Sequence, residues 1–132
     1  MAKEMLSELI YDGSILAIEA YVSTLGVCPT IEFLEKQPQS KQAKFAALFA
    51  RIGDHGKIMN EQKFKHLSNT SQLFEFKVSD KRVLSFFVVG KRLILSHGFT
   101  KKKDKTPRSE IMRAELIKYD FLKRIKYGKK LD

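Results

Sequence analysis

Apolar and polar residues alternate most clearly in the middle of the chain, where they predict three consecutive antiparallel strands. The first covers residues 73–78 and places Glu75 and Lys77 on the face opposite Phe74, Phe76 and Val78. Residues 82–89 are rich in aromatic and β-branched side chains, and residues 92–97 form a third strand-like run. Turns at 79–81 and 90–91 separate the three runs, so a β-meander is expected.

Helical spacing predicts two helices before this meander. The first covers about residues 29–36, with Pro29 in the first turn, where a helix tolerates proline. The second is expected to start at Ser40 as N-cap and to end at Gly53 and Gly56. Its alanine-rich apolar stripe indicates close packing against a sheet or against the first helix.

A third helix is expected to follow the meander, starting at Thr106-Pro107 with Ser109 or Thr106 as its cap. Its apolar residues recur at three- and four-residue steps, which is typical of an amphipathic helix against a core; they are Ile111, Ala114, Ile117, Phe121, Leu122 and Ile125. Residues 129–132 are expected to form a loose tail.

The remaining segments give weaker patterns. Residues 15–23 favour a strand, although a helix competes, and residues 1–12 are expected to be a short helix or a frayed arm. Residues 57–69 are polar with isolated apolar anchors and are expected to form a loop. The pattern therefore predicts an α+β fold, in which a small, mainly antiparallel sheet of about four strands is backed by two N-terminal helices and a C-terminal helix.

Composition narrows the class of protein. A chain of 132 residues with 43% hydrophobic residues is expected to be one domain, 1–132, with its core at about 15–125. The single cysteine, Cys28, excludes an internal disulfide and a cysteine-based zinc site. No signal-peptide run or stretch of 18 apolar residues occurs, so we expect a soluble cytoplasmic protein with no membrane partner.

Positive charge is concentrated in the second half of the chain. The formal net charge is +10, but residues 1–60 carry 6 Lys/Arg against 7 Asp/Glu, whereas residues 61–132 carry 19 against 8. Residues 91–108 alone carry 7 basic residues and one acidic residue. This distribution favours binding to nucleic acid or to an acidic protein, with a solvated lysine-rich face as the alternative.

Four segments, in order, resemble the RelE/ParE toxin superfamily of type II toxin–antitoxin systems, especially its phage-associated HigB-like branch. They are CPTIEFLEKQP, KFKHLSNTSQLFEFK, KRVLSFF and LILSHGFTKKKDKTPRSEIMRAE. The resemblance covers roughly residues 15–124 and implies a RelE-like fold. It also implies a toxin that inhibits translation as a ribosome-dependent endoribonuclease (an mRNA interferase), without a metal or other cofactor. The expected partners are mRNA on the ribosome, with rRNA contacts, and a helix-turn-helix antitoxin.

The same resemblance suggests which residues would act. Metal-free RNA cleavage needs a base for the 2′-hydroxyl, cations for the phosphorane charge and an acid for the leaving oxygen. Arg82 matches the arginine of the family's strand motif, with pairing to Asp80 or Glu75 as the structural alternative. Lys77 closes the preceding strand, and Lys101 and Lys102 match the paired lysines after His-Gly-Phe. One of these lysines could act as base or acid, or all could bind phosphate only.

Histidine titrates near neutral pH, so His97 is a candidate acid or base, with a structural core histidine as the alternative. Phe99 could stack on a base or pack in the core. Further candidates for RNA and phosphate contacts are Lys65, Arg92, Lys103, Lys105 and Arg108. His55, His66 and Cys28 have no metal-ligand spacing. Neither Tyr119 nor Tyr127 matches a motif, so the general base is left undefined.

Two other functions stay open from the sequence. ParE-type relatives share the fold but poison DNA gyrase, so a non-nucleolytic binding protein is one alternative. A degenerate prophage remnant that retains only the fold and antitoxin binding is the other.

Overall fold

The computed structural model describes the backbone of residues 5–131 and the side chains of residues 5–126. Six strands and three helices follow one another as β1 (Ser7–Asp12), β2 (Ala17–Tyr21), α1 (Pro29–Glu35), α2 (Gln39–His55), β3 (Phe64–Leu67), β4 (Leu73–Val78), β5 (Lys81–Val88), β6 (Arg92–Thr100) and α3 (Arg108–Leu131). The fold is α+β, as predicted. No helix within the described residues is long and apolar enough to cross a membrane.

All six strands belong to one mixed sheet, in the order β1-β2-β6-β5-β4-β3. Neighbouring strands are antiparallel except β2 and β6, which run parallel. The meander β4–β5–β6 forms the centre and one side of the sheet, as its alternating pattern indicated. The expectation of a mainly antiparallel sheet is confirmed, but its strand number is six rather than about four.

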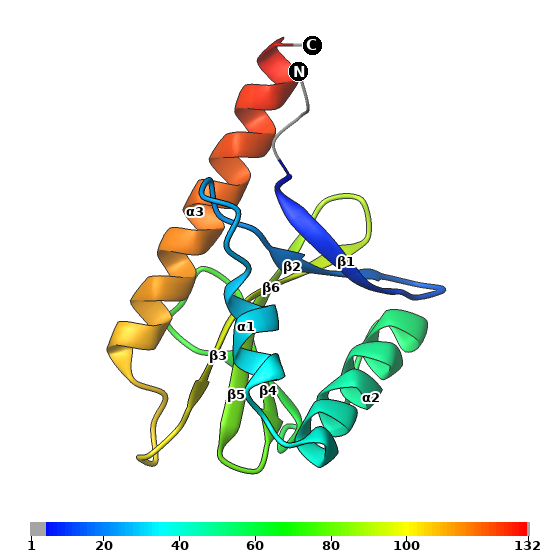
Figure 1. Ribbon diagram of the computed structural model, residues 1–132, viewed down its shortest axis with the longest axis vertical. Helices are drawn as coiled ribbons and strands as arrows, with labels where there is room; N and C mark the ends of the chain where they lie inside the picture. Colours follow the sequence, from blue (N-terminus) through cyan, green and yellow to red (C-terminus); the bar gives the residue numbers. More distant parts are fainter. Residues whose placement is uncertain (1–4, 132) are drawn as a thin grey trace.

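Helices cover both faces of the sheet, and Figure 1 shows α2 and α3 on opposite sides of β4 and β5. One core cluster joins Phe45, Phe49 and Ile52 of α2 to alternate strand residues such as Leu93. The other cluster joins Phe121 of α3 to the intervening strand residues, including Ile94. Because successive strand side chains point to opposite faces, the two clusters lie on opposite sides of the sheet.

Both extra strands are edge strands that hydrophobic alternation does not reveal. β1 replaces the short helix or frayed arm expected before residue 12; Leu9 is 56% exposed, and a register shift after it breaks the alternation. β3 lies inside the expected loop 57–69 and has only four residues. Phe64 and Leu67 enter different core clusters, so the strand presents no single apolar face. Residues 1–4 lie outside the described residues.

Several predicted helix ends are wrong by a few residues. α2 has Pro38 rather than Ser40 at its N-cap, and Gly53 lies inside it instead of ending it. Gly56 does end α2, with φ 78° and an N–H bonded to the Ile52 carbonyl. Ser109 lies within α3, and the Thr106 hydroxyl donates to Glu75. The helix α3 also includes residues 129–131 of the expected tail, while residue 132 is not described.

Gly98 allows α1 to lie directly on β6. A Cβ atom built at this position would come within 2.1–2.7 Å of the Phe33 ring. Gly98→Ala is therefore expected to lower the free energy of unfolding by about 1–3 kcal/mol through overpacking, as measured by urea denaturation. Phe33→Leu in the Gly98→Ala background should recover part of the loss. Full stability of the single variant would contradict this packing.

Candidate functional site

Four cations converge at the end of the sheet where β4 turns into β5. Lys77 of β4 lies opposite Arg82 of β5, and Lys65 of β3 lies opposite Glu75, two residues before Lys77 on β4. Lys101 follows β6, and its backbone N–H donates to the Asp80 carbonyl at 2.7 Å, which fixes it beside the β4–β5 turn. We call Lys65, Lys77, Arg82 and Lys101 the cationic cluster.

Lys77 is half-buried, and its surroundings shift the pKa of its ammonium. Partial burial is the main cause that lowers the pKa of Lys77, and the charges of Lys65, Arg82 and Lys101 lower it further. Glu75 opposes these effects by favouring the charged form. A lysine in such surroundings gives up its proton more easily than an ordinary surface lysine, which favours a role in proton transfer.

Glu75 is a buried carboxylate at the base of the cationic cluster, with only 1% of its surface exposed. Its Oε1 lies 3.5 Å from Arg82 Nε, and its Oε2 accepts a hydrogen bond from the Thr106 hydroxyl. The strand pattern was expected to leave Glu75 on a polar face, but the structure buries it, and Thr106 in the segment before α3 contacts its carboxylate. Glu75 thus ties Arg82 to the basic segment between β6 and α3.

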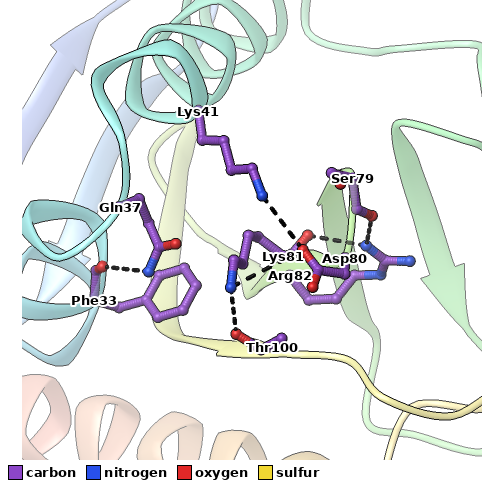
Figure 2. Close-up of polar contacts among 8 residues, drawn as sticks. All are labelled: Phe33, Gln37, Lys41, Ser79, Asp80, Lys81, Arg82 and Thr100. Atoms are coloured by element: carbon purple, nitrogen blue, oxygen red, sulfur yellow. Dashed lines mark hydrogen bonds and ion pairs between the residues drawn. The ribbon is translucent and has the colours of Figure 1, made fainter.

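Arg82 also closes the β4–β5 turn, as Figure 2 shows. Its Nη1 donates to the Ser79 carbonyl at 2.6 Å and to the Lys81 carbonyl at 3.0 Å. Ser79 has a φ of 55°, so these bonds hold a turn in the left-handed region. Among the described residues Nη2 makes no hydrogen bond, so its donors are the ones that a phosphate could use. Of the two structural alternatives, Glu75 rather than Asp80 is the partner of Arg82.

Asp80 pairs instead with lysines on either side of the turn. Its Oδ1 lies 3.5 Å from Lys41 Nζ and 3.9 Å from Lys81 Nζ. Lys81 also donates to the Thr100 hydroxyl at 2.8 Å (Figure 2). Just after the end of α1, the Gln37 side chain donates to the Phe33 carbonyl at 3.0 Å (Figure 2). These contacts tie α2, the β4–β5 turn and the end of β6 together.

His97 is fully buried, and each of its ring nitrogens has a partner. Nδ1 lies 2.9 Å from Ser96 Oγ, and Nε2 lies 3.0 Å from Glu110 Oε1 on α3. Burial, followed by the charge of Arg113, lowers the pKa of His97 to about 4 despite the hydrogen bond to Glu110. His97 is thus a neutral, enclosed side chain that links β6 to α3. This matches the alternative of a structural core histidine rather than an acid or base that contacts the substrate.

The neutral state of His97 should make unfolding depend on pH. Because its folded pKa of about 4 lies below the unfolded value of 6.5, its stabilising effect is present above pH 6.5 and is lost towards pH 4. When the pH falls from 7 to 5, the free energy of unfolding of wild type should decrease by about 2 kcal/mol more than that of His97→Gln, as measured by urea denaturation. His66→Gln, at an exposed histidine, is the control and should match wild type. Titration of the His97 ring near 6.5 by NMR would contradict this.

Two other candidates lie away from the cluster or inside the core. Arg92 stands at the opposite end of β6 from Lys101 and forms a bidentate pair with Glu19, at 2.6 and 2.8 Å. Phe99 is 7% exposed and belongs to the core cluster beneath α3. Stacking of Phe99 on a base would require this packing to open. The structure therefore does not bring Arg92 or Phe99 to the surface of the cationic cluster.

The remaining candidates form an exposed basic border. Four of them lie between the end of β6 and the first residue of α3, and all four are exposed; they are Lys102, Lys103, Lys105 and Arg108. This border follows Lys101 directly along the chain, so exposed cations adjoin the cluster in sequence. Such an arrangement suits a long polyanion better than a small anion.

Sequence reasoning missed the role of Glu75 and Thr106 in holding this site together. Glu75 was considered only as a possible partner of Arg82, and Thr106 only as a helix cap. A single acid between apolar residues of a strand, with an arginine across the adjacent turn, is the signal that could have pointed to a buried pair. Within the residues described, no three His, Cys, Asp or Glu side chains gather in a group that could hold a metal ion.

Comparison with protein-family models matches residues 32–118 to the family described as Phage derived protein Gp49-like (DUF891). The matched region runs from α1 into α3 and contains the whole cationic cluster together with Glu75 and Thr106. No curated protein matches the chain significantly. Because the match covers more than half of its residues, the chain belongs to the Gp49-like family of phage-derived proteins, a member of the RelE toxin–antitoxin-like group.

Proposed function

We propose that this protein is the toxin of a type II toxin–antitoxin system, of the HigB-like branch, and that it cleaves mRNA on the ribosome. The observation that carries the proposal is Lys77, whose pKa is lowered within a group of three further cations. Membership of the Gp49-like family supports a toxin of this group. The reaction proposed is a metal-free endoribonuclease reaction that inhibits translation.

In this reaction the 2′-oxygen of one nucleotide attacks the adjacent phosphorus while the bond to the 5′-oxygen breaks. A base takes the proton of the 2′-hydroxyl, and an acid protonates the departing 5′-oxygen. Lys77 is suited to one of these proton transfers because its lowered pKa makes it release a proton more readily than an ordinary lysine. Arg82 Nη2, with Lys65 and Lys101, stabilises the negative charge on the phosphorane oxygens. The products are a 2′,3′-cyclic phosphate and a 5′-hydroxyl end.

The basic border, Lys102, Lys103, Lys105 and Arg108, would contact the phosphates of mRNA and rRNA. Such contacts release counterions, so association with the ribosome should weaken steeply as salt rises. Ribosomal alignment of the mRNA would supply part of the catalysis, which suits a site with few conventional acid–base groups. We further propose a helix-turn-helix antitoxin as the partner that keeps the toxin inactive.

One observation favours a second candidate, a non-nucleolytic binding protein of the same fold. Arg82 is engaged by Glu75 and the turn, His97 is enclosed, and Phe99 is in the core. A site with this arrangement could bind a gyrase surface or RNA without cutting either.

Induction of the protein in cells, with primer extension of mRNA minutes later, separates the two candidates. New 5′ ends within translated frames, absent when initiation is blocked, are the result expected of the nuclease. Growth arrest with intact transcripts and inhibited supercoiling would favour the gyrase-binding candidate. Normal growth would oppose both and indicate a degenerate remnant.

A further inference from the structure

A cavity of about 460 Å³ lies between α2 and the end of β4, and of the cationic cluster only Lys77 lines it. Its volume is within the range of about 300–1,000 Å³ that is usual for small-molecule sites. Basic side chains come from α2 and from the segment that precedes β3, and the wall also contains apolar residues. The lining consists of Lys44, Ala47, Leu48, Arg51, Gln62, Lys63, Lys77, Val78 and Ser79.

One face of α2 forms a side of this cavity. Lys44, Ala47, Leu48 and Arg51 follow one another at steps of three, one and three residues, which places them on a single helical face. Lys63 faces them from the segment before β3. No acidic side chain lines the cavity. All the charged side chains that line the cavity are therefore positive.

Three of the cations that line the cavity are unpaired, in contrast to Lys41, an earlier residue of α2. Lys41, one turn before Lys44, forms an ion pair with Asp80 (Figure 2). Within the described part of the chain, Lys44, Arg51 and Lys63 make no salt bridge or side-chain hydrogen bond. Three unpaired cations around one cavity repel one another, and an anion bound among them would offset this repulsion.

We propose that this cavity is a second RNA subsite, which holds one nucleotide of the strand away from the phosphate that is cleaved. Lys44, Arg51 and Lys63 would bind its phosphate, and Gln62 supplies an amide for a base or ribose hydroxyl. The apolar wall of Ala47, Leu48 and Val78 would contact the sugar or base. A phosphate ion alone would leave most of the volume and the whole apolar wall unused.

Lys77 links the subsite to the cationic cluster. It lines the cavity, and its ammonium interacts with Lys65, Arg82 and Lys101 of the cluster. An RNA strand that passes the end of β4 can therefore place successive nucleotides in the cavity and in the cationic cluster. This inference rests on the proposed function for the identity of its ligand as RNA, but the subsite itself can be tested without ribosomes or cleavage.

The first test uses 5′-AMP as the probe and follows backbone amides of the isolated protein by NMR. We expect saturable shifts at Ala47, Leu48 and Val78, with adenosine at least tenfold weaker because it lacks the phosphate. Lys44→Ala/Arg51→Ala should weaken 5′-AMP binding at least tenfold. Lys57→Ala removes an exposed lysine that does not line the cavity, and it should bind as wild type does.

Three results would overturn the subsite: shifts confined to the surroundings of Glu75 and Arg82, equal binding by the double variant, or equal loss in Lys57→Ala. Tight binding of an acidic peptide with no 5′-AMP binding would assign the cavity to a protein instead. A second experiment measures binding of a short single-stranded RNA at several salt concentrations. In the double variant, the slope of log K against log[salt] should become less negative by about 1–2. The first test stands whether or not the wild-type protein cleaves mRNA, so failure of the subsite and failure of the nuclease are distinguishable.

Discussion

Lys77→Ala should lower the rate of ribosome-dependent mRNA cleavage by about 10²- to 10⁴-fold, the range expected for loss of a general acid or base. Lys77 is half-buried on β4, and burial with three neighbouring cations lowers its pKa. The fold should survive, because no salt bridge joins Lys77 to the rest of the described structure. The measurement is the single-turnover cleavage rate on programmed ribosomes.

Lys77→Arg and Lys57→Ala serve as controls for this result. Arginine keeps the positive charge but does not give up its proton, so Lys77→Arg should stay impaired if proton transfer is the role of Lys77. Recovery of the rate by arginine would instead assign Lys77 to phosphate binding. Lys57→Ala should cleave like wild type. Wild-type cleavage by Lys77→Ala would exclude Lys77 from the reaction.

Arg82→Ala should affect stability as well as activity. Its partner Glu75 is 1% exposed, and without Arg82 this carboxylate would keep the hydrogen bond from Thr106 and the charge of Lys77. Removing one member of a buried ion pair costs about 3–5 kcal/mol, and the turn bonds to Ser79 and Lys81 would also be lost. We therefore expect the free energy of unfolding to fall by about that amount in urea denaturation.

The double variant Glu75→Gln/Arg82→Ala separates the two effects. Glutamine removes the buried charge and retains an acceptor for Thr106, so the double variant should recover part of the stability. It should still cleave poorly, because the guanidinium is absent. Equal stability of Arg82→Ala and wild type would show that the Glu75–Arg82 pair does not hold this part of the sheet.

Central elements were predictable because one residue pattern defined each of them. The strands β4, β5 and β6 have strong alternation or β-branched content, and α2 has an apolar stripe that ends at Gly56. β1 and β3 were not predictable, because an edge strand buries few side chains. Their existence depends on backbone pairing with β2 and β4, which local sequence does not encode.

The candidate site was likewise predictable only in part from the sequence. Motif resemblance pointed to Lys65, Lys77, Arg82 and Lys101, and the sheet brings these four together. It could not show that Arg92 is paired with Glu19 at the far end of β6. Nor could it show that α3 encloses His97. Both facts depend on which distant segment covers a strand position, and this is decided by tertiary packing.

The most direct measurement of the central claim is cleavage in a reconstituted system. Purified protein is mixed with ribosomes that hold a defined mRNA codon in the A site, and in parallel with the same mRNA alone. Our proposal predicts new ends with a 2′,3′-cyclic phosphate and a 5′-hydroxyl on the ribosome only, and their loss in Lys77→Ala. Intact mRNA on the ribosome with folded wild-type protein would contradict it.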